Sequence, residues 1–316
     1  MYIIKQVPED FIVKEIPVYK LDDEGEYSYF ILKKKNYNTV DALEKVAKKL
    51  RTKMKYIGFA GNKDKAAVTE QVCSVKNVSK EKLEKIDLSR ISIKYIGNGK
   101  NPISLGDLKG NEFVITVRNL RAQKNIEPKR IPNYFGEQRF SKNNVSIGRA
   151  IIQRNFKAAI RLIDDYRVRD YLEEYPYDYA GALRRLPLKT RRIYVHAYQS
   201  WIWNEAVKQY MRGNPITNEK IPIVGFGTEF KNKSISVIIN KILRNEGINL
   251  RDFVIKQMPE LSSEGSERNL FVMPEDFWVE FYDDGLNKGR YKAIVHFILG
   301  KGSYATEVIR YLFNLL

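Results

Sequence analysis

The stretch WVEFYDDGLNKGRYKAIVHFIL (residues 278–299) decides the fold that the sequence predicts. Two runs of β-branched and aromatic residues flank Asp284-Gly285, a dipeptide typical of a tight turn. We therefore expect two antiparallel strands here. A last helix follows, with an apolar face made of Val308, Ile309, Leu312 and Phe313.

The first part of the chain carries the same strand signals. YSYFILK (residues 27–33) is rich in aromatic and branched residues, and residues 91–95 and 113–118 alternate between apolar and polar side chains. Alternation of this kind predicts strands with one wetter face. Between them, Thr39 is the expected N-cap of a helix whose apolar face includes Val40, Leu43, Val46, Ala47 and Leu50.

The middle of the chain is different, because helical periodicity dominates from about residue 146 to 265. Helical signals cover residues 147–163 and residues 190–212. The second of these segments is apolar around much of its circumference, which predicts a buried helix. The sequence thus predicts an α+β fold with a mixed, mainly antiparallel sheet. We expect one domain from residues 1–145 and 266–316, interrupted by an inserted, largely helical domain from residues 146–265.

Composition narrows the class of partner. The 316 residues include 55 Lys and Arg against 38 Asp and Glu, a net charge of +17. Such a charge favours an anionic partner, most often nucleic acid. No apolar run is long enough to span a membrane, and the N-terminal residues lack the apolar stretch of a signal peptide. The single Cys73 excludes a disulfide framework, so we expect a cytoplasmic protein.

The sequence contains few cysteine and histidine residues that could bind a metal ion. Cys73, His196 and His296 are the only cysteine and histidines, so a zinc site of Cys and His ligands is excluded. Carboxylates that hold a magnesium ion remain open at this point. We expect His196 to lie in the core, because it falls among apolar residues of a helical segment.

Two charged motifs stand out. FAGNKDKAAVTEQ (residues 59–71) places Asp64 between Lys63 and Lys65, just after Gly61-Asn62. A solvated turn has the same pattern, so the motif alone leaves a surface turn and a functional carboxylate open. RRLPLKTRR (residues 184–192) has five basic residues, which fits either a phosphate-contacting patch or a solvated start of a helix.

Four long segments together resemble the TruD family of pseudouridine synthases, and they occur in the family's order. They are PEDFIVKEI (residues 8–16), FAGNKDKAAVTEQ (59–71), NYFGEQRFS (133–141) and GKGSYATEVIR (300–310). Weaker matches lie between them: NYNTVDAL (36–43), LGDLKGNEFVITVR (105–118) and HAYQSWIWNEAV (196–207). Any one of these segments would be weak evidence, but four in order are very specific.

This resemblance implies a pseudouridine-synthase-type catalytic domain interrupted by an insertion called the TRUD domain. The implied reaction isomerises a uridine of tRNA, usually position 13, to pseudouridine. It implies tRNA as the partner, no metal and no organic cofactor. Nothing in the sequence indicates an obligate dimer, so we expect a monomer.

The resemblance also implies site residues. It makes Asp64 the catalytic carboxylate and places Lys5 beside it. Attack by the carboxylate on C1′ or on C6, and removal of a sugar proton, all remain open for Asp64. Such chemistry requires an ionised carboxylate, which a neighbouring cation favours.

The remaining motifs match positions that contact the substrate in the family. An enzyme that acts on a base takes it out of the stack and holds it between flat groups and hydrogen bonds. By resemblance Phe11, Asn133 and Tyr304 are such contacts, and Phe135 is a further candidate. Tyr304 departs from members that have Phe here, and its hydroxyl adds a hydrogen-bonding group. Arg139 stays unassigned.

A second class of function shares these features. An RNA-binding or RNA-folding protein of the same fold, with secondary or lost catalysis, would be equally basic. The intact GNKDK segment (residues 61–65), together with the aromatic residues and Asn133, favours the enzyme.

Overall fold

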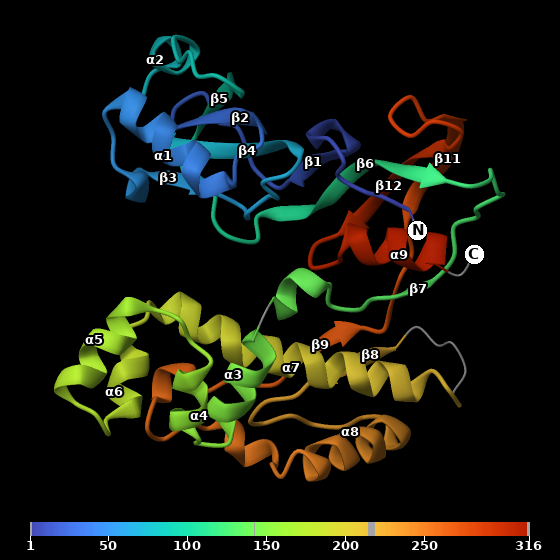
Figure 1. The fold of residues 1–316 in the computed structure, drawn as a ribbon. Helices are drawn as coiled ribbons and strands as arrows, with labels where there is room; N and C mark the ends of the chain where they lie inside the picture. Colours follow the sequence, from blue (N-terminus) through green and yellow to red (C-terminus); the bar gives the residue numbers. More distant parts are fainter. Residues whose placement is uncertain (1, 142, 214–218, 315–316) are drawn as a thin grey trace. The chain divides into compact units, whose positions relative to one another are not determined.

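The structure is a computed structural model that describes residues 2–141, 143–213 and 219–314. The chain forms two compact units, each built from its own contacts (Figure 1). Unit 1 comprises residues 1–130 and 273–316, and unit 2 comprises residues 131–272. Among the described residues no helix is both long and apolar enough to cross a membrane.

Unit 1 is built on one eight-stranded sheet, in the order β11-β12-β6-β1-β4-β2-β5, with β3 paired to β4. Its strands are β1 (Phe11–Pro17), β2 (Tyr27–Lys35), β3 (Ile57–Phe59), β4 (Val68–Lys76), β5 (Ile91–Gly99), β6 (Leu108–Leu120), β11 (Glu275–Asp283) and β12 (Tyr291–Gly300). In the described residues of this sheet, only the β1–β4 pair is parallel. The predicted α+β class with a mixed, mainly antiparallel sheet is confirmed.

The C-terminal hairpin joins the sheet through β12, which pairs with β6. Val295 lies opposite Ile115, and Phe297 lies opposite Phe113, with all four side chains buried. The alternation in the sequence therefore faces the core as expected. In this way residues from the far end of the chain complete the N-terminal sheet.

Two longer helices belong to unit 1, α1 (Thr39–Leu50) and α9 (Ala305–Asn314), together with the short α2 (Lys80–Glu84). In α1, Leu43 and Val46 are fully buried and pack in one cluster with Phe30 and Leu32 of β2. The prediction of Thr39 as the N-cap is wrong, because the Asn38 side chain caps the helix by accepting from the N–H of Asp41. The short 3-10 turns are Pro8–Asp10 and Met54–Tyr56.

Unit 2 is mainly helical. Its helices are α3 (Asn144–Ile152), α4 (Phe156–Arg161), α5 (Tyr166–Glu174), α6 (Tyr179–Arg184), α7 (Leu188–Tyr210) and α8 (Lys233–Asn245). Small pairs join β7 (Ile131–Pro132) to β10 (Phe271–Val272) and β8 (Lys220–Ile223) to β9 (Ser266–Asn269). Its 3-10 turns are η3 (Glu137–Phe140), η4 (Leu250–Phe253) and η5 (Pro259–Leu261).

Helix α7 is the buried helix that the sequence predicts, and Val195, Tyr198 and Ile202 are fully buried on it. The predicted helical segment at residues 147–163 is two helices. Arg154 takes a left-handed backbone conformation (φ 61°), and Asn155 then caps α4. A left-handed residue cannot continue an α-helix, so the segment divides there.

The contact borders of unit 2 lie at residues 131 and 272, outside the predicted insertion of residues 146–265. The difference comes from the β7–β10 pair and from η3, which join the helices of unit 2. The assignment of functional domains to these units stays a prediction.

Candidate active site

Asp64 lies in the loop between β3 and β4, a segment without regular secondary structure that side chains hold in place. The Lys63 N–H donates to Thr39 Oγ1 at 2.8 Å, and Thr39 in turn donates to Gln71 Oε1 at 2.9 Å. Gln71 Nε2 donates to the Gly61 carbonyl at 3.1 Å. The loop that carries Asp64 is therefore fixed to α1 and β4.

The side chain of Lys34 in β2 also holds this loop in place. Its side chain is buried, and Nζ donates to the carbonyls of Tyr37 at 2.6 Å and Asp64 at 2.9 Å, with the Lys63 carbonyl at 3.5 Å. Burial lowers the pKa of Lys34 to about 8; the Asp64 charge opposes this shift and Lys63 adds to it. Satisfying main-chain carbonyls with a buried ammonium fixes the backbone on both sides of Asp64.

Lys63 does not serve as the partner of Asp64. Its Nζ forms a buried ion pair with Glu15 of β1 at 2.5 Å, and Glu15 also accepts from the Val72 N–H at 3.3 Å. A buried pair of this kind is costly to break, because one charge would be left without a partner. The pair ties the loop to the centre of the sheet.

Lys5 is the partner of Asp64. Its Nζ lies 2.6 Å from Asp64 Oδ2, and the two side chains are 24% and 28% exposed. The Lys5 backbone is left-handed (φ 60°), a conformation that non-glycine residues adopt only when their surroundings impose it. The Lys5 ammonium also lies 4.0 Å from the centroid of the Phe11 ring. The structure thus brings together Asp64, Lys5 and Phe11.

This arrangement can perform carboxylate chemistry. The Asp64 carboxylate is held on a fixed loop, is reachable from solvent and has its charge balanced by one ammonium. Such a group can act as a nucleophile or as a base toward a bound substrate. Phe11 itself is only 3% exposed and packs edge-on against Phe113.

Tyr304 belongs to unit 1, in the loop between β12 and α9, and its side chain is half-buried. Its carbonyl accepts from the N–H groups of Glu307 and Val308 in the first turn of α9. The helix therefore fixes the backbone that carries the Tyr304 ring.

Asn133 and Phe135 lie in unit 2, where Arg268 of β9 contacts both. Arg268 donates to the Asn133 carbonyl at 2.8 Å and to Asn133 Oδ1 at 2.7 Å, and its guanidinium lies 4.1 Å from the Phe135 ring centroid. Asn204 of α7 forms two hydrogen bonds with the Phe135 backbone. Arg268 is a positioning residue that the sequence gives no signal for.

His196 is half-buried and lines a pocket of unit 2 together with Arg139 and Arg192, so its predicted place in the core is wrong. The basic segment at residues 184–192 divides. Arg191 is buried and bonds Glu260, whereas Arg192 is exposed and lines the pocket.

Sequence reasoning also missed Lys34 and Glu15, although a signal for both exists. In β1, Phe11, Val13 and Glu15 share the buried face, and in β2, Phe30, Leu32 and Lys34 do so. A charged residue at an inward position of an otherwise apolar alternation marks a buried polar network.

Comparisons with known proteins agree with this architecture. The chain is 29% identical to the "tRNA pseudouridine synthase D" of Aquifex aeolicus, covering 98% of this chain and 97% of that protein. It is 30% identical to the "Probable tRNA pseudouridine synthase D" of Thermococcus sibiricus, covering 97% and 93%. A solved structure of the "Putative tRNA pseudouridine synthase D (TruD)" from Methanosarcina mazei superposes with a TM-score of 0.78 at 27% identity, covering 98% of this chain and 93% of that chain.

The fold and the charge define the class of protein first. It is a basic α+β protein in which a mainly helical unit interrupts the part of the chain that forms the sheet. The chain belongs to the family tRNA pseudouridine synthase D (TruD), whose model matches residues 2–168, 162–221 and 216–312. Membership makes it a tRNA pseudouridine synthase, which is an isomerase.

Proposed function

We propose that this enzyme converts uridine 13 of tRNA into pseudouridine and that Asp64 is its catalytic carboxylate. One observation carries the proposal: Asp64 Oδ2 lies 2.6 Å from Lys5 Nζ on a fixed loop, with part of its side chain open to solvent. The charge of the whole chain favours an RNA substrate.

The reaction breaks the N1–C1′ bond of the uridine, turns the base and joins C5 to C1′. The proton on C5 is lost and N1 gains one, so no redox step or donor molecule is involved. Asp64 attacks C1′ or C6, or removes a sugar proton, and each route needs the carboxylate in its negative form. Lys5 keeps that charge balanced and the side chain oriented.

The aromatic residues and Asn133 are proposed to hold the base. Phe11 supports Lys5 from the core, and Tyr304 offers a partly open ring. Asn133 has an amide that can recognise the uracil edge, and Phe135 supports the same segment. We further propose that the enzyme acts as a monomer in the cytoplasm, without metal or organic cofactor.

The test is turnover on an unmodified tRNA transcript, with pseudouridine mapped to single nucleotides by carbodiimide labelling and primer extension. We expect one modified position, at uridine 13, and none in a transcript with cytidine there. Pseudouridine at any other position would contradict the assignment of uridine 13 as the target. Tight tRNA binding without modification anywhere would favour the RNA-binding alternative.

A further inference from the structure

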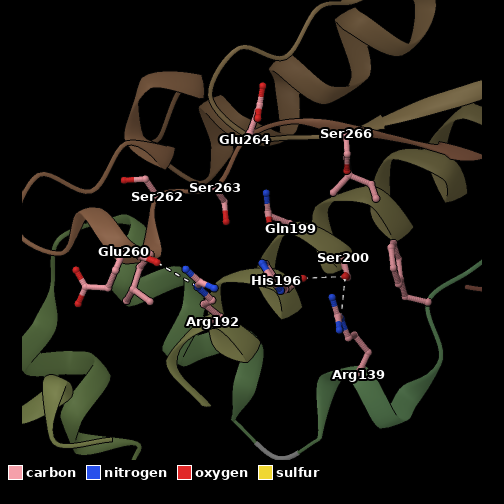
Figure 2. Close-up of a pocket in the computed structure, with 13 residues that line it drawn as sticks. Arg139, Arg192, His196, Gln199, Ser200, Glu260, Ser262, Ser263, Glu264 and Ser266 are labelled. Carbon is pink, nitrogen blue, oxygen red and sulfur yellow. Dashed lines mark hydrogen bonds between the residues drawn. The ribbon is translucent and has the colours of Figure 1, made fainter. Parts of the chain in front are cut away.

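Unit 2 contains a polar pocket of about 390 Å³, bordered by η3, α7 and the segment of residues 260–266 (Figure 2). Small-molecule sites occupy roughly 300–1,000 Å³, so the space suits a ligand larger than a single ion. Every residue that lines it belongs to unit 2, and neither Asp64 nor Lys5 is among them.

Two arginines face this pocket without an acidic partner among the described residues. Arg139 Nε donates to Ser200 Oγ at 3.3 Å, and Arg192 Nε donates to the Glu260 carbonyl at 3.2 Å. Their terminal guanidinium nitrogens have no hydrogen bond to the described part of the chain. Guanidinium groups bind phosphate through paired hydrogen bonds, so these two are suited to an anion.

The acidic residues of the pocket do not neutralise the charges of Arg139 and Arg192. The carboxylate of Glu260 on η5 bonds Arg191 at 2.5 Å, so its charge is already compensated. Glu264 is exposed and lies across the pocket from Arg139 and Arg192 in Figure 2.

The pKa of His196 reflects the positive charge of these two arginines. Burial, then Arg139, then Arg192 lower the pKa of its imidazole, which favours the neutral form of the ring. An anion bound between the two arginines would screen them and raise the pKa of His196 again.

The pocket also offers flat and apolar surfaces. Phe135, Ile223 and Leu261 line it together with His196 and Ser262. RNA-binding proteins hold unstacked bases on aromatic and guanidinium planes and use hydroxyl and amide groups for their edges.

We propose that this pocket binds one phosphate-bearing nucleotide of the RNA substrate, with Arg139 and Arg192 at the phosphate and His196 at the base. The choice of RNA as the source of the nucleotide rests on the proposed function. The pocket would anchor the RNA on unit 2 by contacts separate from the carboxylate chemistry of Asp64.

The chain has only two histidines, which makes NMR of the imidazoles a direct test. His296, in unit 1, bonds the Asp276 carbonyl and Glu112, so it serves as the internal control. On titration of the whole protein with 5′-UMP, we expect the His196 signals to shift, its pKa to rise, and His296 to stay unchanged. Uridine and inorganic phosphate should each bind more weakly than 5′-UMP.

Variants locate the contact. Arg139→Gln and Arg192→Gln should each weaken 5′-UMP binding about tenfold or more, because each removes a charged hydrogen-bond donor. Arg161→Gln is the matched control: Arg161 is an exposed arginine of α4 outside the pocket, and its loss should leave binding unchanged.

No shift of His196 with 5′-UMP would overturn the inference, and so would equal binding of phosphate or uridine alone. The outcome is independent of catalysis. A protein that forms pseudouridine but shows no nucleotide at His196 contradicts this inference alone. A protein that binds 5′-UMP there but forms no pseudouridine contradicts the proposed function alone.

Discussion

Lys34 and Asp64 are coupled although their side chains do not form an ion pair. Lys34 Nζ donates to the Asp64 carbonyl, and the Asp64 charge raises the pKa of Lys34 against the larger effect of burial. A buried ammonium therefore supports the backbone of the proposed catalytic residue, while Lys5 balances its side chain. Two lysines divide the tasks of holding the loop and orienting the carboxylate.

This coupling predicts the titration of Lys34. In the wild-type protein Lys34 should titrate near pH 8, and in Asp64→Asn its pKa should fall further, because the opposing negative charge is gone. NMR of 13C-labelled lysine measures both values, and the signal missing in Lys34→Met identifies the residue. Titration of Lys34 together with the surface lysines, or no change in Asp64→Asn, would contradict the described network.

From the sequence, residues of the candidate site could be named, but not the residues that contact them in the structure. Asp64 and Lys5 lie 59 positions apart, and only resemblance to a family joined them before the structure placed them at 2.6 Å. Lys34 and Glu15 were visible as charges at inward strand positions, yet their partners depend on which strands are adjacent. Arg268 lies 135 positions from Asn133, and no local pattern links them.

Among the elements, Arg118 of β6 joins the start of β1 to the β11–β12 turn. It bonds Asp10 in the turn before β1 and Asp284 after β11, each at 2.7 Å, with both carboxylates buried. Asp10 directly precedes Phe11, so this arginine also fixes the start of the strand that carries the Phe11 ring. Asp284, which the sequence predicts in a tight turn, is also part of this buried network.

Asp284 makes acid stability a test of the network. Burial raises its pKa, but hydrogen bonds from Asn119, Asn287, Leu286 and Arg118 outweigh this effect and bring the pKa to about 2. The stabilisation is complete above the unfolded pKa near 3.8 and is lost as the pH falls through 2. The difference in unfolding free energy between wild type and Asp284→Asn should narrow by roughly 2 kcal/mol from pH 5 to 2. Urea unfolding at each pH measures it, and a constant difference would contradict the assignment.

Strands were predictable from runs of aromatic and branched residues, as in β2 and β12, and from alternation, as in β6. The buried α7 was predictable from its apolar circumference. The parallel β1–β4 pair was not, because pairing between distant strands leaves no local signal. The division between α3 and α4 depends on one left-handed residue, Arg154, a type that occurs in helices as well.

The whole molecule is basic, and Lys and Arg outnumber Asp and Glu in both units. Part of this charge is already used in internal ion pairs, as at Lys63, Arg118 and Arg191. The remaining exposed cations are available to RNA phosphates.

Affinity for tRNA should therefore fall steeply with salt, because each neutralised phosphate releases counterions, with a slope of roughly 0.9 per contact on duplex regions. Fluorescence anisotropy with labelled tRNA across salt concentrations gives the slope. Binding that stays flat between low and moderate salt would contradict a phosphate-directed surface.

The measurement that tests the central claim most directly is pseudouridine formation by Asp64→Asn. Asn has nearly the same size but cannot act as an ionised carboxylate, so turnover should fall about a thousandfold or more while melting temperature and tRNA affinity stay close to wild type. Asp87→Asn, at an exposed aspartate of the same unit, is the matched control and should retain full activity. Substantial turnover by a folded Asp64→Asn protein would contradict the account.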